Sequence, residues 1–132
     1  MTRNEARELL MQIMYELDTA KNMNNETAVQ LIEERLAGNH ITRGKDLVAK
    51  IIENIEDVDA VINEHSKSWK TNRMPKVDLA IIRLAVGEMK YADDVPTAVA
   101  INEAIDLAKR YSTDRSSKFV HGVLGAIAKG NE

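Results

Sequence analysis

The segment VDLAIIRLAVGEMKYA, residues 77–92, would be apolar around almost its whole circumference as a helix, and it constrains the fold more than any other stretch. A helix that is apolar on nearly every side has to be buried, so other helices must pack around it. The rest of the chain supplies them, because glycine and proline are scarce and apolar residues recur at helical spacing almost throughout. No alternating strand pattern or internal repeat is found. The sequence therefore predicts an all-α bundle of about six to seven helices around one core.

Local signals predict where the first four helices begin and end. Thr2 and Glu5 have the spacing of a capping box, in which each residue satisfies a backbone N–H of the other. A short second helix is predicted to end at Gly38. The third is expected to begin near Thr42 and to be interrupted near Asp57, whose carboxylate can cap a fourth helix.

The C-terminal third of the chain carries signals for two further helices. Pro96 suits the start of the first, and Ser116 or Ser117 is expected to cap the second. Gly122 and Gly125 lie inside this last predicted helix, where each costs about 1 kcal/mol relative to alanine. We expect them to allow the close approach of a neighbouring helix, with contact to a ligand as the second interpretation.

Composition limits the class of protein. A chain of 132 residues with 44% hydrophobic and 30% charged residues is typical of a single globular domain, expected to span residues 1–132. No apolar run approaches the ~20 residues of a membrane span, so no membrane partner is expected. Cysteine is absent, which fits a reducing cytoplasm. With a net charge of −3 and a pI of about 5.7, the chain can bind nucleic acid only through a local basic patch.

The sequence offers no catalytic or metal-binding constellation. His40, His65 and His121 lie in three different predicted elements and have no metal-ligand spacing, so structural or surface roles are expected for them. No glycine-rich phosphate loop is present. The sequence therefore argues against an enzyme and predicts neither a metal nor a cofactor.

The basic residues are clustered in the sequence. KSWKTNRMPK, residues 67–76, contains no acid and includes the single tryptophan, and KRYSTDRSSK, residues 109–118, contains one acid. Arg3 and Arg7 lie one helical turn apart near the N-terminus. Cations pair with phosphates and aromatic rings stack on unpaired bases, so this combination favours single-stranded RNA.

Phe119, the only phenylalanine, has two interpretations. The last predicted helix has a complete apolar stripe without it, formed by Val120, Val123, Leu124 and Ile127. Phe119 could still pack on the edge of the core beside Val123. Alternatively it could stack on a base, while the helix N-terminus and the side chains of residues 116–118 bind a phosphate.

The run DVPTAVAINEAIDLAKRYSTDRSSKFVHGVLGAIA, residues 94–128, resembles the C-terminal signature of the NusB family of bacterial transcription antitermination factors. ARELLMQIMYELD and RMPKVDLAIIRLAVGEM also resemble the family, so the similarity spans nearly the whole chain. The resemblance implies two small helical sub-bundles and an RNA-binding subunit that pairs with NusE, a small-subunit ribosomal protein. Together they would bind boxA RNA, a single-stranded element of nascent ribosomal RNA, and help the RNA polymerase antitermination complex to pass terminators.

The resemblance also implies which residues contact the two partners. Asp78 is expected to contact NusE. Asn4 and Glu5 stand where the family is often richer in arginine, which lowers the charge available for RNA, and His121 replaces the usual asparagine and is expected to keep a structural or polar role. Six residues match RNA-facing positions: Arg3, Arg7, Ser116, Ser117, Lys118 and Phe119.

Two other functions remain open at this point. One is a helical protein-interaction module with little intrinsic RNA binding, which the acidic pI favours. The other is the RNA-recognition part of an RNA-modifying enzyme, although a chain ending at Glu132 leaves no room for a methyltransferase domain. Some relatives dimerise and shield their basic face, so a homodimer is also open.

Overall fold

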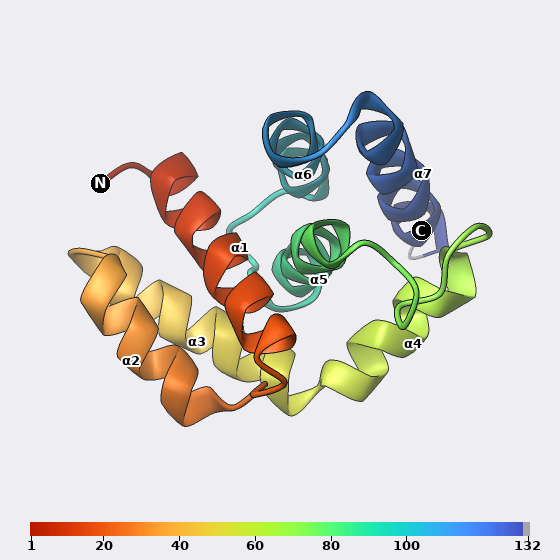
Figure 1. Ribbon diagram of the computed structural model, residues 1–132. Helices are drawn as coiled ribbons and strands as arrows, with labels where there is room; N and C mark the ends of the chain where they lie inside the picture. Colours follow the sequence, from red (N-terminus) through yellow and green to blue (C-terminus); the bar gives the residue numbers. More distant parts are fainter. Residues whose placement is uncertain (131–132) are drawn as a thin grey trace.

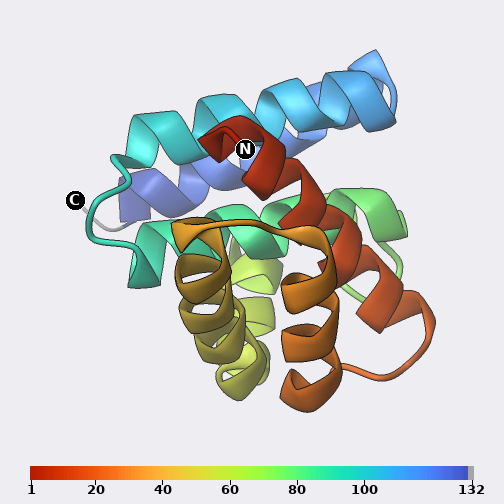
Figure 2. The same ribbon diagram turned by 90° about the vertical axis from the view of Figure 1, so that its left-hand side faces the viewer.

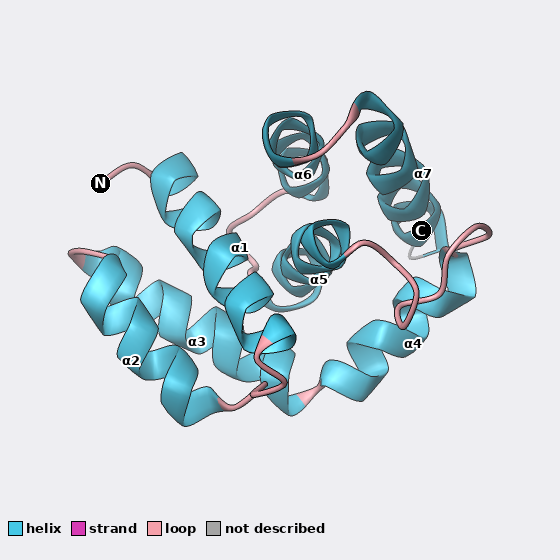
Figure 3. Ribbon diagram, viewed as in Figure 1, coloured by secondary structure: helices cyan, strands magenta, loops and turns pink. Residues whose placement is uncertain are grey.

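The structure is a computed structural model that describes residues 1–130, and within this range it contains seven α-helices and no strand (Figures 1 and 3). The predicted all-α class and helix number are therefore confirmed. Within the described range, no helix is both long enough and apolar enough to cross a membrane. The helices are α1 (Arg3–Thr19), α2 (Asn25–Arg35), α3 (Asn39–Glu53), α4 (Ile55–His65), α5 (Lys76–Tyr91), α6 (Thr97–Tyr111) and α7 (Asp114–Gly130).

Helix α5 lies at the centre of the molecule (Figure 1). Every residue from Asp78 to Glu88 is buried, as the apolar character of this segment predicts. Helices α1, α2 and α3 pack together on one side of α5, while α6 and α7 pack together on the other, and α4 contacts both α5 and α7. Figure 2 shows α6 and α7 as a layer across α5 from α2 and α3. The two groups of helices share α5 as their common core element.

Side chains that precede the first two helices satisfy their free backbone N–H groups. The predicted capping box of α1 is present: the Thr2 hydroxyl accepts from the Glu5 N–H at 3.1 Å, and the Glu5 carboxylate accepts from the Thr2 N–H at 3.4 Å. At α2, the Asn24 side chain accepts from the Thr27 N–H at 3.0 Å. These short-range contacts explain why both helices begin where they do.

The connection between α2 and α3 differs from the prediction. Helix α2 ends at Arg35 rather than at Gly38, because Leu36 adopts an extended backbone that places its side chain in the core. Gly38 instead precedes α3 with a φ of +62°, a left-handed conformation that glycine adopts without strain. The reversal at this glycine lets α3 begin at Asn39, three residues before the predicted Thr42.

The break between α3 and α4 falls at Asn54, not near Asp57 as predicted. The Asn54 side-chain amide donates to the Lys50 carbonyl at 2.8 Å, which satisfies an acceptor in the last turn of α3. Asp57 lies within the first turn of α4, where its negative charge interacts favourably with the helix dipole.

The glycines that permit close helix contact are not the predicted ones. A Cβ atom on Gly122 or Gly125 would meet nothing within 4 Å, so the expectation of a neighbouring helix there was wrong. Close approach occurs at Gly87 of α5, where a Cβ would lie 2.3 Å from the Ile51 Cδ1 of α3. A ligand contact at Gly122 or Gly125 stays a prediction.

Candidate nucleic-acid interface

A cavity of about 330 Å³ lies between the C-terminal part of α6 and the first turns of α7. Its lysines, Lys109 and Lys118, are both exposed. Neither lysine forms an ion pair within residues 1–130. The neighbouring Arg110 does, with Glu8 and with Asp106. The cavity therefore presents two unpaired cations against a single carboxylate, beside the start of a helix. It is lined by Ile105, Lys109, Asp114, Ser117, Lys118 and His121.

Thr113 caps α7, so the prediction that Ser116 or Ser117 is the cap was wrong. The Thr113 hydroxyl accepts from the Ser116 N–H at 3.1 Å. Both serines are buried one turn into the helix. The Ser112 hydroxyl donates to that of Ser116 at 2.8 Å, and the Ser117 hydroxyl donates to the Asp114 carbonyl at 2.9 Å. The two predicted hydroxyl donors are therefore engaged within the protein, although Ser117 borders the cavity.

Asp78 lies in the first turn of α5 and is 0% exposed, so this structure does not present it to a partner protein. Neither carboxylate oxygen has a hydrogen bond of good geometry. Burial raises the pKa of Asp78, and the nearby hydroxyls of Ser116 and Ser112 lower it in part. The sequence did contain a signal against surface exposure, because Asp78 belongs to the segment predicted to be buried on every side.

Lys118 and Phe119 have different environments. Lys118 is exposed and borders the cavity beside α6. The Phe119 ring is half-buried and packs edge-on against Trp69, with ring centroids 5.0 Å apart and planes at 73°. This contact supports packing at the core edge, and it leaves only part of the ring accessible to a base.

Tyr111, at the end of α6, is a more exposed aromatic residue that the sequence analysis did not single out. The residue is 40% exposed, and the Arg110 guanidinium lies 5.8 Å from the ring centroid. The Tyr111 hydroxyl donates to Glu8 and accepts from Gln12 at 2.8 Å, which joins α1 to the end of α6. Tyr111 and Arg110 together lower the pKa of Glu8. An exposed ring beside a cation is suited to stacking on a base.

The two predicted arginines of α1 differ in their availability. Arg7 makes two hydrogen bonds to Glu88 of α5, of 2.9 and 2.8 Å, and the two side chains are only 11% and 7% exposed. The Glu88 carboxylate raises the pKa of Arg7. Arg3 lies on the surface, with its guanidinium 2.8 Å from Asp94. Arg7 therefore ties α1 to α5, while Arg3 remains accessible.

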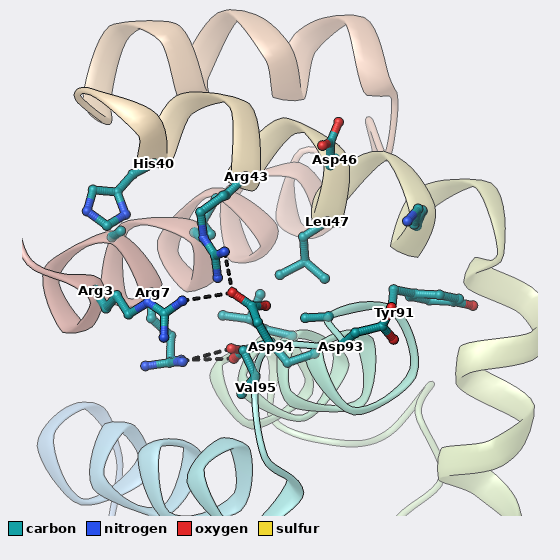
Figure 4. A pocket seen from close by; sticks show the side chains of 17 residues that line it. Arg3, Arg7, His40, Arg43, Asp46, Leu47, Tyr91, Asp93, Asp94 and Val95 are labelled. Carbon is teal, nitrogen blue, oxygen red and sulfur yellow. Dashed lines mark hydrogen bonds and ion pairs between the residues drawn. The ribbon is translucent and has the colours of Figure 1, made fainter.

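A second cavity, of about 340 Å³, opens between α1, α3 and the connection from α5 to α6 (Figure 4). Arg43 of α3 reaches into it and pairs with Asp94, a contact that the sequence analysis did not anticipate. The His40 ring contacts the Met1 carbonyl at 3.1 Å. The lining of this cavity contains equal numbers of cations and carboxylates, which are Arg3, Arg7, Arg43 and Lys50 and Asp46, Glu88, Asp93 and Asp94.

The basic segment at residues 67–76 is partly used within the fold. The Lys70 ammonium donates to the carbonyls of Asn63 and Ser66 at 2.9 and 2.8 Å, at the C-terminal end of α4. Lys76 lies 3.4 Å from Asp18 of α1. No group of three or more metal-ligating side chains comes together in the part of the chain that the structure describes. Lys67 and Arg73 of the same segment are exposed and form no ion pair within residues 1–130, so accessible cations lie here as well as at the α6–α7 cavity.

Comparison with known proteins gives the family of the chain. The model of the NusB family matches residues 4–129. The transcription antitermination protein NusB of Chloroherpeton thalassium is 44% identical over 129 residues, which cover 95% of this chain and 60% of that relative. T. maritima NusB superposes with a TM-score of 0.87 at 31% identity, covering 98% of this chain and 92% of that one. In a crystal structure of the antitermination factors NusB and NusE with dsRNA, the matching chain has a TM-score of 0.84 at 27% identity, with 97% and 96% covered. The chain therefore belongs to the NusB family.

Proposed function

We propose that this protein is a non-catalytic RNA-binding adaptor of transcription antitermination, which acts in the cytoplasm with NusE on the boxA element of nascent ribosomal RNA. Family membership and the similarity to a NusB chain solved with NusE and dsRNA support this function. The observation that carries it is the α6–α7 cavity, where Lys109 and Lys118 lie unpaired beside the start of a helix. Such a site attracts phosphate, and no other use of the two lysines is seen within residues 1–130.

The proposed RNA path combines phosphate and base contacts. Lys118 and Lys109 bind backbone phosphates at the α6–α7 cavity, and Arg3 extends the basic surface along α1. The accessible part of Phe119 and the exposed ring of Tyr111 offer contacts to unstacked bases. Because the whole chain has a net charge of −3, NusE would supply part of the affinity.

The first test is a titration of labelled boxA RNA and a scrambled RNA at two salt concentrations, with and without NusE. We expect a preference for boxA that NusE strengthens and that salt weakens, because phosphate contacts release counterions. Equal binding to both RNAs, or no binding even with NusE, would contradict the proposal.

Replacing Lys118 with alanine is expected to weaken RNA binding about equally for boxA and scrambled RNA. If Lys118 neutralises one phosphate, the slope of log affinity against log salt should decrease in magnitude by about one. Lys129→Ala is the matched control, because Lys129 is an exposed lysine of the same helix, 11 residues away and so about 16 Å along its axis. Equal effects of the two substitutions would remove Lys118 from the proposed site.

Replacing Phe119 with alanine is expected to weaken boxA binding by about 1–3 kcal/mol through loss of a stacking contact. It should also lower the melting temperature, because the ring packs against Trp69. The control is Val123→Ala, which removes a buried side chain one turn further along α7 and should affect stability alone. If both variants retain wild-type affinity at a temperature where they are folded, Phe119 belongs to the core edge only.

The alternative of a protein-interaction module with little intrinsic RNA binding makes a different prediction. The arginines of α1 are already engaged, Arg7 by Glu88 and Arg3 by Asp94. This alternative predicts that the protein binds NusE, but that the complex shows no preference for boxA over scrambled RNA. The titration described above distinguishes the two functions.

A further inference from the structure

Asp94 joins two arginines that come from different helices. Arg3 of α1 and Arg43 of α3 both direct a guanidinium group at the same oxygen, Oδ2 of Asp94 (Figure 4). The Arg3 Nη2 lies 2.8 Å from this oxygen. Among these three side chains one carboxylate therefore faces two positive charges, although the lining of the whole cavity contains as many carboxylates as cations.

The arginines are accessible and suited to a larger anion. The side chains of Arg3, Arg43 and Asp94 are 57%, 42% and 48% exposed, so water and ions reach all three. Guanidinium groups present several N–H donors in a plane and pair with phosphate oxygens more extensively than with one carboxylate oxygen. The neighbouring Arg7 is held by Glu88, which leaves Arg3 and Arg43 as the arginines able to exchange their partner.

The three residues belong to different kinds of element. Arg3 and Arg43 belong to helices, whereas Asp94 lies in the short connection between the end of α5 at Tyr91 and the start of α6 at Thr97. The Asp94 side chain is about half exposed, so rotation between its rotamers is enough to move the carboxylate away from the two arginines. The adjoining cavity of about 340 Å³ leaves room for a phosphate group beside the two guanidinium groups.

We propose that Arg3 and Arg43 form a binding site for one backbone phosphate of RNA, and that Asp94 occupies this site in the free protein. The proposal rests on the RNA-binding function given above and adds Arg43, on α3, to the RNA-contacting surface. When RNA binds, a phosphate takes the place of the Asp94 carboxylate between the two guanidinium groups. The internal carboxylate thus competes with RNA and lowers the apparent affinity of the site.

Asp94 remains an effective competitor near neutral pH. The Arg43 guanidinium, through its hydrogen bond, holds the pKa of Asp94 below its usual value, with a further contribution from the charge of Arg3. The carboxylate is therefore ionised whenever the arginines are available, and only substitution or a competing anion removes it.

The test compares Asp94→Asn, Arg43→Ala and the double variant for binding to boxA RNA in the presence of NusE. Asp94→Asn is expected to tighten binding several-fold and to increase the magnitude of the salt slope by about one, because the phosphate no longer displaces a carboxylate. Arg43→Ala should weaken binding. In the double variant the gain from Asp94→Asn should disappear, because the phosphate site has lost one of its two donors.

The control is Asp93→Asn, which removes an equal charge from the adjacent residue lining the same cavity. If Asp93→Asn tightens binding as much as Asp94→Asn, or if the gain persists without Arg43, overall charge explains the effect and the proposal is overturned. It is also overturned if Asp94→Asn raises the affinity for NusE without RNA, because the site would then serve an acidic protein segment.

A separate measurement distinguishes failure of this site from failure of the proposed function. Inorganic phosphate is titrated into wild-type and Asp94→Asn protein, and the Nε–H resonances of Arg3 and Arg43 are followed by NMR. Larger shifts at lower phosphate concentration in the variant support the site even if boxA binding is absent. If phosphate shifts these resonances identically in wild-type and Asp94→Asn protein, the proposed phosphate site is overturned, even if the protein binds boxA RNA.

Discussion

Replacing Glu88 with alanine is expected to lower the free energy of unfolding by about 3–5 kcal/mol, the range for breaking a buried ion pair. Glu88 accepts two hydrogen bonds from Arg7, and both side chains are nearly buried. Without Glu88 the Arg7 guanidinium would remain largely out of water and would lose the carboxylate that it hydrogen-bonds, with only the charge of Glu103 left to act on it. The pair also connects α1 to the central α5, so its loss should loosen the packing of α1.

Urea unfolding followed by circular dichroism measures this effect. Glu33→Ala is the matched control, because Glu33 pairs with Lys45 on the surface, where such pairs contribute about 0–1 kcal/mol. Replacing both Arg7 and Glu88 with methionine should restore much of the lost stability, since no charge is then left buried. If Glu88→Ala is no more destabilising than the surface control, water must solvate Arg7 and the pair contributes little.

Replacing Asp78 with asparagine is expected to raise the free energy of unfolding at neutral pH by about 1–3 kcal/mol, the order of the penalty for an unpaired buried polar group. Asp78 is 0% exposed and neither carboxylate oxygen has a well-formed hydrogen bond, so the ionised form is poorly solvated. Asparagine has nearly the same shape and no charge. Its amide could also donate to the Ser112 or Ser116 hydroxyl nearby.

The stabilisation by Asp78→Asn should depend on pH in a specific direction. Burial raises the pKa of Asp78 in the folded protein above its ordinary value of 3.8, so the folded state binds more protons than the unfolded state between the two values. The stability of the wild type therefore falls as pH rises from 3.8 through the raised pKa, and the variant lacks this loss.

Unfolding measured between pH 3.5 and 8 tests this dependence as the difference between the two proteins, which cancels the contribution of the other acids. The difference should be small at the acidic end and reach its full value at neutral pH. If the difference in stability between the variant and the wild type does not vary with pH, its cause is packing and not the ionisation of Asp78. A variant that is less stable at pH 7 would show that the serine hydroxyls stabilise the carboxylate.

The candidate site was less predictable than the fold. Lys118 lies on the surface as expected, because a long cation at a helix start is rarely buried. Ser116 and Ser117 were expected to be donors at the helix terminus, but Thr113 is the cap and turns both serines inward. The sequence did not indicate a binding role for Arg43, because this residue belongs to neither of the two basic segments, residues 67–76 and 109–118.

The sequence by itself determined the features that depend on residues a few positions apart. The capping box at Thr2, the proline before α6 and the apolar spacing of α5 each act within one or two helical turns, so a linear pattern records them. The same pattern could have placed Asp78 inside the molecule, because it belongs to a helix that is apolar on nearly every side, but the resemblance to the family led us to expect a contact with NusE instead.

Only the tertiary structure decided which distant side chains meet. Phe119 packs against Trp69, 50 positions earlier, and Arg7 pairs with Glu88, 81 positions later. These partners depend on the angle and register at which helices pack across α5, and helical periodicity specifies which face is buried but not what it contacts. Whether an arginine of this chain is buried in an ion pair or available to a phosphate is therefore decided by helix packing.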